Sequence, residues 1–100
     1  TMIHELTHIW QFENWKTSEI TRLYPESDHR DIVYEGMAVW TSIQYMYMIG
    51  ENSYAQKQEI LMDNRKDLYG DGFRMYSEKY PINRDSSINE FTPFAQFPPL

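Results

Sequence analysis

Hydrophobic residues recur along this chain at intervals of three and four residues, which is the spacing of one face of a helix. No stretch alternates with the period of two that a half-buried strand needs. The pattern predicts a first helix over residues 2 to about 15, a second over about 29–49 and a third over about 52–68. Gly50 is a stop signal for the second helix, and a polar connection fills residues 16–30.

The last third of the chain carries the strongest helix-breaking signals. Gly70 and Gly72 predict an interruption after the third helix, because glycine is unfavourable inside helices. A helix is expected to resume at once and to end before Pro81, since four aromatic residues keep helical spacing across the glycines: Tyr69, Phe73, Tyr76 and Tyr80. From residue 82 onward the prolines predict an irregular tail, and its aromatic residues Phe94 and Phe97 could pack across the helices.

Local signals also mark the helix starts. Thr1 could cap the first helix, and Asn52 or Ser53 could cap the third. Asp28, with Asp31 three residues later, resembles a capping box ahead of the second helix.

The distribution of apolar side chains predicts which helix faces are buried. The second helix carries them around nearly its whole circumference, so it is expected to be the central helix of the fold. In the first helix, Ile3, Leu6 and Trp10 share one side and His4 and His8 lie broadly on the other, which predicts burial on both sides. The expected fold is mainly α, with three to four helices in one domain over residues 1–100 and an irregular tail over 82–100.

Composition narrows the classes of partner. With 100 residues the chain makes one domain at most, and 41% hydrophobic residues fit a globular protein. A net charge of −6 argues against nucleic acid and anionic membranes as partners. The chain has no cysteine, which excludes disulfides and thiolate metal sites without assigning a compartment. No stretch is long and apolar enough for a membrane span.

The chemistry of the chain is concentrated in the segment His4-Glu5-Leu6-Thr7-His8. Residues four apart lie one turn up the same helix face, so both imidazoles can point at one ion. Glu5 lies on the adjoining flank, where it can reach a water without being a ligand. This H-E-x-x-H arrangement is that of zinc peptidases, with two His ligands and a Glu that takes the proton of the water.

A catalytic zinc ion usually has a third protein ligand, and Glu35 is the best candidate. It lies on an apolar side of the second helix, where a carboxylate is costly unless it is paired or bound to metal. Pairing with Arg30 or another basic residue is the competing explanation. His29 and Asp31 are rival ligands, but both lie in the polar first turn of the helix. Gly36 suggests that another backbone passes close to this position.

The segments His4-Glu5-Leu6-Thr7-His8-Ile9-Trp10 and Tyr34-Glu35-Gly36-Met37-Ala38-Val39-Trp40 together resemble the gluzincin clan of zinc metallopeptidases. Within that clan they look most similar to bacterial minigluzincin-like proteins and to the peptidase domain of plant LIM-domain growth regulators. Tyr69-Gly70-x-Gly72-Phe73-Arg74 is similar to a segment that follows the second helix in the same group.

The resemblance implies one Zn²⁺ per chain held by His4, His8 and Glu35, with Glu5 as general base. It implies hydrolysis of a peptide or protein substrate, and a soluble bacterial protein that is either cytoplasmic or secreted. Tyr69, Arg74 and Tyr76 are candidates for stabilising the oxyanion, because they follow the ligand helix. A catalytically inactive peptide-recognition module and a purely structural zinc module are the alternatives.

The chain also departs from the family. The spacing from His8 to Glu35 is longer than in thermolysin-like enzymes. Those enzymes place an Asp four residues after the Glu ligand to orient a His, and Val39 stands there in this chain.

The family sheet that pairs with substrate has no counterpart in these residues, so we expect this chain to be the C-terminal part of a longer one. Its partners would be the upstream segment or, through an uncovered face with Ile3, Leu6 and Trp10, a second copy in a homodimer.

Overall fold

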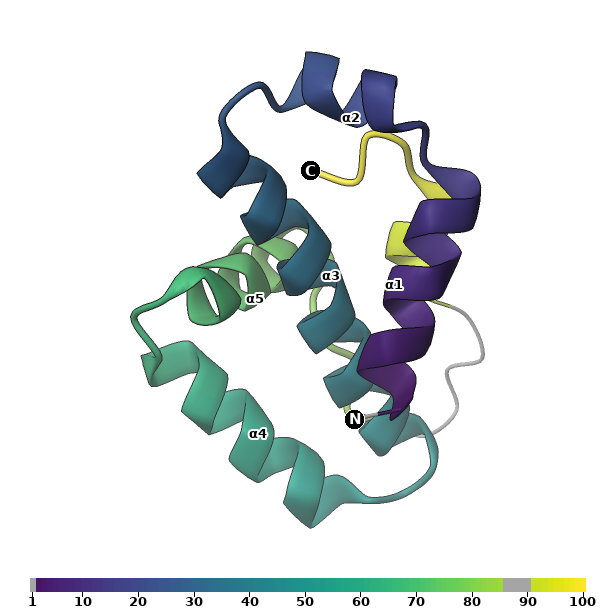
Figure 1. Ribbon diagram of the computed structural model, residues 1–100. Coiled ribbons are helices and arrows are strands. Elements are labelled where there is room, and N and C mark those ends of the chain that lie inside the picture. The colour runs from purple at the N-terminus through teal and green to yellow at the C-terminus, as the bar shows by residue number, and fades with distance from the viewer. Residues whose placement is uncertain (1, 86–90) are drawn as a thin grey trace.

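The computed structural model describes residues 2–85 and 91–100, and it contains helices but no strand within those ranges. Five α-helices and one short 3₁₀ helix succeed one another along the chain (Figure 1): α1 Met2–Asn14, α2 Thr17–Leu23, α3 Ser27–Met48, α4 Asn52–Asn64, α5 Leu68–Lys79 and η1 Thr92–Ala95. The expectation of a mainly α fold is confirmed, although five helices replace the expected three or four. No helix in the described ranges is long and apolar enough to cross a membrane.

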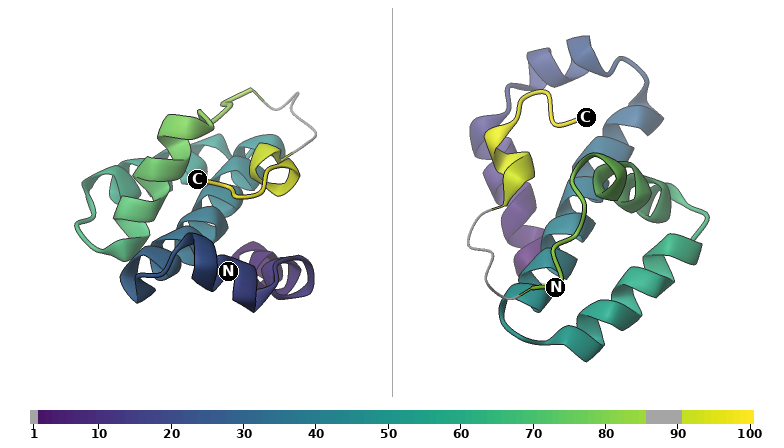
Figure 2. Two further views of the ribbon diagram at one scale, coloured as in Figure 1. Left: turned by 90° about the horizontal axis from the view of Figure 1, so that it is seen from above. Right: turned by 180° about the vertical axis from the view of Figure 1, so that it is seen from behind.

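The long helix α3 is the centre of the fold, as its all-round apolar pattern predicts. It packs against α1, α4 and α5, and Val33, Met37 and Ala38 are completely buried within it. Figure 1 shows α1 on one side of α3 and the pair α4 and α5 on the other, while Figure 2 shows the same arrangement from above and from behind. Residues on α3 can therefore meet side chains from three other helices.

The helices α3 and α5 cross at van der Waals contact between their backbones. A Cβ atom built on Gly36 would lie 2.7 Å from the Cα of Gly72, and one built on Gly72 would lie 2.6 Å from the Cα of Gly36. The close backbone approach expected at Gly36 is thus confirmed. Next to the crossing, the Tyr76 hydroxyl donates to the carbonyl of Val33 at 3.1 Å.

The prediction of a polar connection over residues 16–30 is wrong in part, because this segment contains the seven-residue helix α2. Ile20 is its one buried residue, and such a short helix shows too few apolar positions for a periodic signal. The capping box expected at Asp28 is also absent, since α3 begins at Ser27 after Glu26 with no side-chain cap. Helix α4 likewise has no side-chain cap, and the expected cap at Thr1 lies outside the described residues.

The break between α4 and α5 falls earlier than the glycines predict. Residues 65–67 form the connection, and Gly70 and Gly72 lie inside α5. Asp67 starts α5, because its carboxylate accepts a hydrogen bond from the backbone N–H of Gly70 at 3.2 Å. The glycines serve close packing rather than chain reversal, since a Cβ on Gly70 would lie 2.1 Å from the carbonyl oxygen of Arg65.

The tail packs across the helices, as its aromatic residues predict. The Phe94 ring lies 4.4 Å from that of Trp10, and the carbonyl of Leu100 accepts a hydrogen bond from the Tyr24 hydroxyl. The tail is not wholly irregular, because η1 forms a single 3₁₀ turn with a proline at its start, where no N–H donor is needed.

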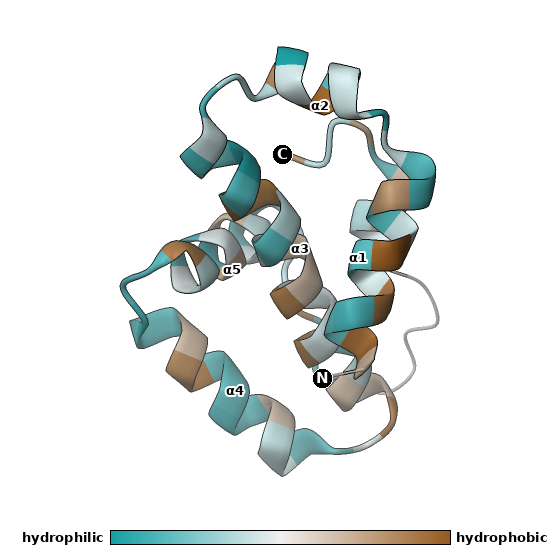
Figure 3. Cartoon of the chain, viewed as in Figure 1, coloured by the Kyte–Doolittle hydropathy of each residue, from teal (hydrophilic) through white to brown (hydrophobic). Residues whose placement is uncertain are grey.

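Helix α1 is buried on one side only, contrary to the sequence-based expectation. Trp10 is partly covered by the tail, but Leu6 is 50% exposed and Ile9 is 52% exposed. Hydrophobic positions along α1 are visible in Figure 3. The buried side of this helix is instead polar, with Thr7 and Gln11 facing α3.

The glycine crossing predicts the effect of a methyl group at its centre. In Gly72→Ala the new Cβ meets rigid backbone, so overpacking of about 1–3 kcal/mol should outweigh the gain of about 1 kcal/mol in helix propensity. Urea unfolding should show a net destabilisation. Glu78→Ala, an exposed site on the same helix, should change the free energy of unfolding by less than about 0.5 kcal/mol. Equal stability of the two variants would contradict the crossing.

Buried tyrosines predict a loss of stability at alkaline pH. Burial raises the pKa of five tyrosines above the ordinary value of 10.0: Tyr24, Tyr34, Tyr47, Tyr76 and Tyr80. Unfolded tyrosine loses its proton above about pH 10 while the folded group keeps it, so stability is full below that pH and falls as the pH rises through the raised values. Urea unfolding at pH 8 and pH 11 tests this.

Tyr76→Phe is the matched variant for the alkaline experiment. It should cost about 1 kcal/mol at pH 8, because the hydrogen bond to Val33 is lost, and it should weaken the dependence on pH. A free energy of unfolding that stays constant from pH 8 to pH 11 would contradict the assignment.

Candidate metal centre

Two helices bring His4, His8 and Glu35 together at one point. His4 and His8 project from successive turns of α1, and Glu35 projects from the facing turn of α3. The Nε2 of His8 lies 2.5 Å from one carboxylate oxygen of Glu35, and the Nε2 of His4 lies 3.4 Å from the other. One donor atom from each residue lies within 4.8 Å of the other two, so this group could hold a metal ion.

The structure does not support the competing roles of the neighbouring residues, as a partner or as rival ligands of the centre. Arg30 does not pair with Glu35, because its Nη1 donates to the carbonyls of Tyr24 and Pro25. His29 lies against the Tyr24 ring, and Asp31 is exposed. Among the described residues, neither joins the cluster of donor atoms. The three expected ligands are thus brought together and the two rivals are not.

The three donor residues are half-buried. The three side chains are between 17% and 19% exposed, so they are shielded but reachable. Burial lowers the pKa of the His4 imidazole, and the opposing effect of the Glu35 carboxylate does not cancel it. A neutral imidazole is the form that binds metal, so this shift favours ligation near neutral pH.

Gln11 is a further residue of the cluster, which the sequence pattern did not predict. Its side chain is fully buried and its carbonyl oxygen lies 2.8 Å from the Nδ1 of His8. Its amide nitrogen donates to the carbonyl of Tyr34 on α3 at 3.0 Å. With Nδ1–H donated to Gln11, the Nε2 of His8 would be the atom left to bind an ion. The i, i+3 spacing from His8 was the available signal.

Two hollows flank the three donor residues. One, of about 480 Å³, is lined by Glu5 and Asp31 together with His8, Phe12, Tyr34 and Glu35. The other, of about 240 Å³, lies on the side of His4 between α3 and α4. Glu5 is exposed and is not one of the clustered donors, so its carboxylate is available to a molecule in the first hollow.

The three candidates for oxyanion stabilisation lie in different surroundings. The Tyr69 ring is 6.5 Å from that of His4, and the negative charge of Glu35, together with a hydrogen bond to it, raises the pKa of the Tyr69 hydroxyl. Tyr76 is completely buried against α3. Arg74 holds the end of α4, because its Nη1 donates to the carbonyls of Met62, Asp63 and Arg65.

Comparisons with protein-family models, with curated proteins and with solved structures each found no match for this chain. The interpretation of the centre therefore depends on its own side chains. A half-buried group of two imidazoles and one carboxylate, with an oriented His8, could bind a metal ion.

The cluster predicts saturable binding of a divalent cation such as zinc. At about 100 times the dissociation constant, binding to the folded state adds about 2.7 kcal/mol, which should raise the melting temperature by about 10 °C or more. His4→Ala and Glu35→Ala should abolish this shift, while His29→Ala, which changes the third histidine of the chain, should keep it. An equal shift in all three variants would exclude the cluster as the binding site.

Gln11 predicts a separate effect on affinity. Gln11→Leu keeps the three donors but removes the partner of His8, so the zinc affinity measured by calorimetry should fall about 10- to 100-fold. Gln56→Leu, an exposed site on α4, is the control and should leave the affinity unchanged. An unaltered affinity in Gln11→Leu would show that the hydrogen bond does not orient the imidazole.

Proposed function

We propose that this chain carries the centre of a gluzincin-type zinc metallopeptidase and that it hydrolyses peptide bonds. The observation that supports this most strongly is the meeting of His4, His8 and Glu35 between α1 and α3, with Glu5 beside them. The order of these residues along the chain is that of the gluzincin motif, an H-E-x-x-H helix followed by a Glu on a second helix.

Zinc is the ion that best fits this donor set. Two imidazole nitrogens and one carboxylate oxygen are the ligands of His₂Glu catalytic zinc sites, which keep a fourth position for water or substrate. The oriented imidazole of His8 and the absence of thiolates agree with that class of site. A bound zinc ion would supply a Lewis acid and would lower the pKa of water toward about 7.

Glu5 is proposed as the general base. Its carboxylate lies at the hollow that His8 and Glu35 also line, next to the place where a peptide carbonyl would be held. From there it can accept a proton from the attacking water and pass it to the leaving amine. The exposed Asp31 also lines this hollow.

Tyr69 is proposed as the donor that stabilises the oxyanion. It is the one member of the trio with Arg74 and Tyr76 whose ring lies beside His4, and a tyrosine hydroxyl is protonated at neutral pH. A neutral O–H is what a developing oxyanion needs. Tyr76 and Arg74 act in packing and in holding α4, since Tyr76 donates to the carbonyl of Val33 and Arg74 donates to backbone carbonyls and to Asp71.

A structural or inactive peptide-recognition zinc module is the second candidate. The described residues contain no strand that could pair with an extended peptide, which is the usual mode of substrate binding in zinc peptidases of this type. A general base at position 5 has no use in either module, and its presence favours the enzyme.

Glu5→Gln separates the enzyme from the structural module. The variant should bind zinc as tightly as the unaltered chain, because Glu5 is not among the clustered donors, but hydrolysis of a fluorogenic peptide library should fall about 10²–10⁴-fold. Glu13→Gln, an exposed position on the same helix, is the control. Zinc binding without hydrolysis by the unaltered chain would favour the structural module.

A further inference from the structure

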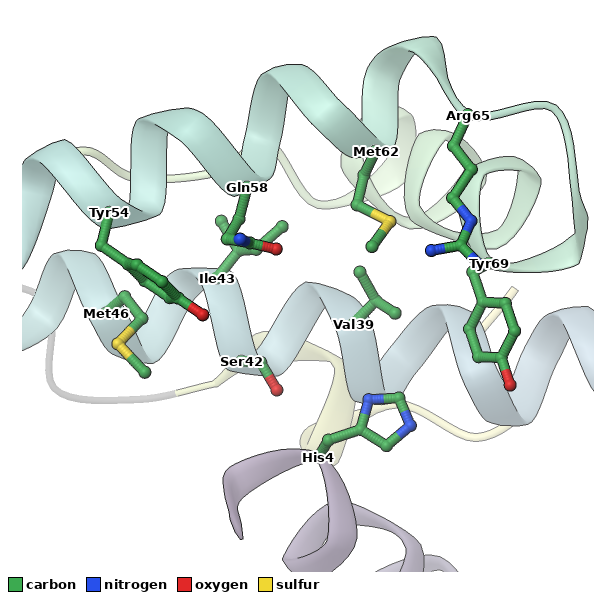
Figure 4. Close-up of a pocket in the computed structure, with 10 residues that line it drawn as sticks. All are labelled: His4, Val39, Ser42, Ile43, Met46, Tyr54, Gln58, Met62, Arg65 and Tyr69. Atoms are coloured by element: carbon green, nitrogen blue, oxygen red, sulfur yellow. The ribbon is translucent and has the colours of Figure 1, made fainter. Parts of the chain in front are cut away.

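The hollow on the His4 side has the form of a pocket for one side chain. It lies between α3 and α4, and Figure 4 shows His4, Arg65 and Tyr69 at one end and Met46 and Tyr54 at the other. We infer that this pocket selects ligands whose apolar side chain lies next to the group held at the metal centre, an inference that rests on the proposed zinc site.

The walls of the pocket are largely apolar and adaptable, although the Gln58 amide on α4 also lines them. Val39 and Ile43 form one wall on α3, and Met62 faces them from α4. The Ser42 hydroxyl, which also lines the pocket, already donates to the carbonyl of Ala38 at 2.9 Å, so it adds little polarity. Methionine side chains can change shape around different occupants. The pocket should therefore accept apolar groups of several shapes.

The volume of the pocket limits its occupant to a single side chain. At about 240 Å³ it is smaller than the range of about 300–1,000 Å³ that is usual for whole ligands of drug size. Since His4 stands at its mouth, a ligand anchored at the metal centre can direct one substituent between α3 and α4.

The mouth of the pocket holds a guanidinium that is paired with a carboxylate. The Arg65 guanidinium lies 5.1 Å from the centre of the Tyr69 ring, and its Nε pairs with Asp67 at 2.5 Å. This pair holds the cation at the entrance, beside His4. A basic side chain entering there would lose its hydration and find no carboxylate among the residues that line the pocket, so the pocket should favour apolar over basic groups.

A series of amino-acid hydroxamates tests the inference without relying on catalysis. The hydroxamates of glycine, leucine, phenylalanine and lysine share one metal-binding group and differ only in the side chain. On the zinc-loaded chain, leucine and phenylalanine hydroxamates should bind about tenfold or more tightly than the glycine compound, by burial of apolar area. The lysine compound should bind no more tightly than glycine.

A filled pocket provides the matched control. Ser42→Leu places a larger side chain in the cavity and should remove the preference for leucine and phenylalanine while zinc and glycine hydroxamate still bind. Ser53→Leu, at an exposed position of α4, should keep the preference. The hydroxamate series on the unaltered chain decides the question even if Ser42→Leu folds poorly.

The outcomes separate this inference from the proposed function. Equal affinity for the four hydroxamates, or tightest binding of the lysine compound, would overturn the pocket while leaving the zinc centre in place. Failure of the chain to bind zinc at all would overturn the centre itself.

Discussion

The contact between the backbones of Gly36 and Gly72 sets the distances on which the rest of the molecule depends. Gly36 directly follows Glu35, and Tyr69 lies one turn before Gly72 on α5. Because neither glycine carries a side chain, α5 can approach α3 closely enough for the Tyr69 hydroxyl to interact with the Glu35 carboxylate. A wider crossing would separate the ligand helix from the residue proposed to act beside it.

On the opposite side of α3, the buried residues that α1 contributes to the interface are polar. Gln11 is fully buried and connects His8 to the backbone of α3, and Thr7 donates back to its own helix at Ile3. Buried polar groups are costly unless they are paired, so a helix slipped by one residue would leave Gln11 unsatisfied. This interface therefore fixes the register in which His4 and His8 face Glu35.

The sequence predicts which residues meet at the candidate centre better than it predicts the connections. Two sequence signals for the centre are strong because both depend on local helical geometry. They are the spacing of His4 and His8 and the carboxylate of Glu35 on an apolar helix face. The break at residues 65–67 was misplaced because glycine signals a turn and a close approach equally well, and only the fold decides between them. Nothing in the sequence around Gln11 distinguishes it from a surface glutamine, because its burial depends on the packing of α3. Helix α2 was missed because it is too short for a periodic pattern.

The docking of the tail on Trp10 has a thermodynamic consequence for the centre. Trp10 lies two residues after His8, and Phe94 packs on its ring while the carbonyls of Pro99 and Leu100 accept hydrogen bonds from Tyr80 and Tyr24. If the docked tail steadies α1, metal binding and tail docking are linked equilibria, and each must strengthen the other by the same factor. An ion at His4 and His8 would then slow proteolysis of residues 91–100, and a chain cut before them would hold that ion less tightly. Protection of the C-terminal segment would thus report on occupancy of a site at the other end of the chain.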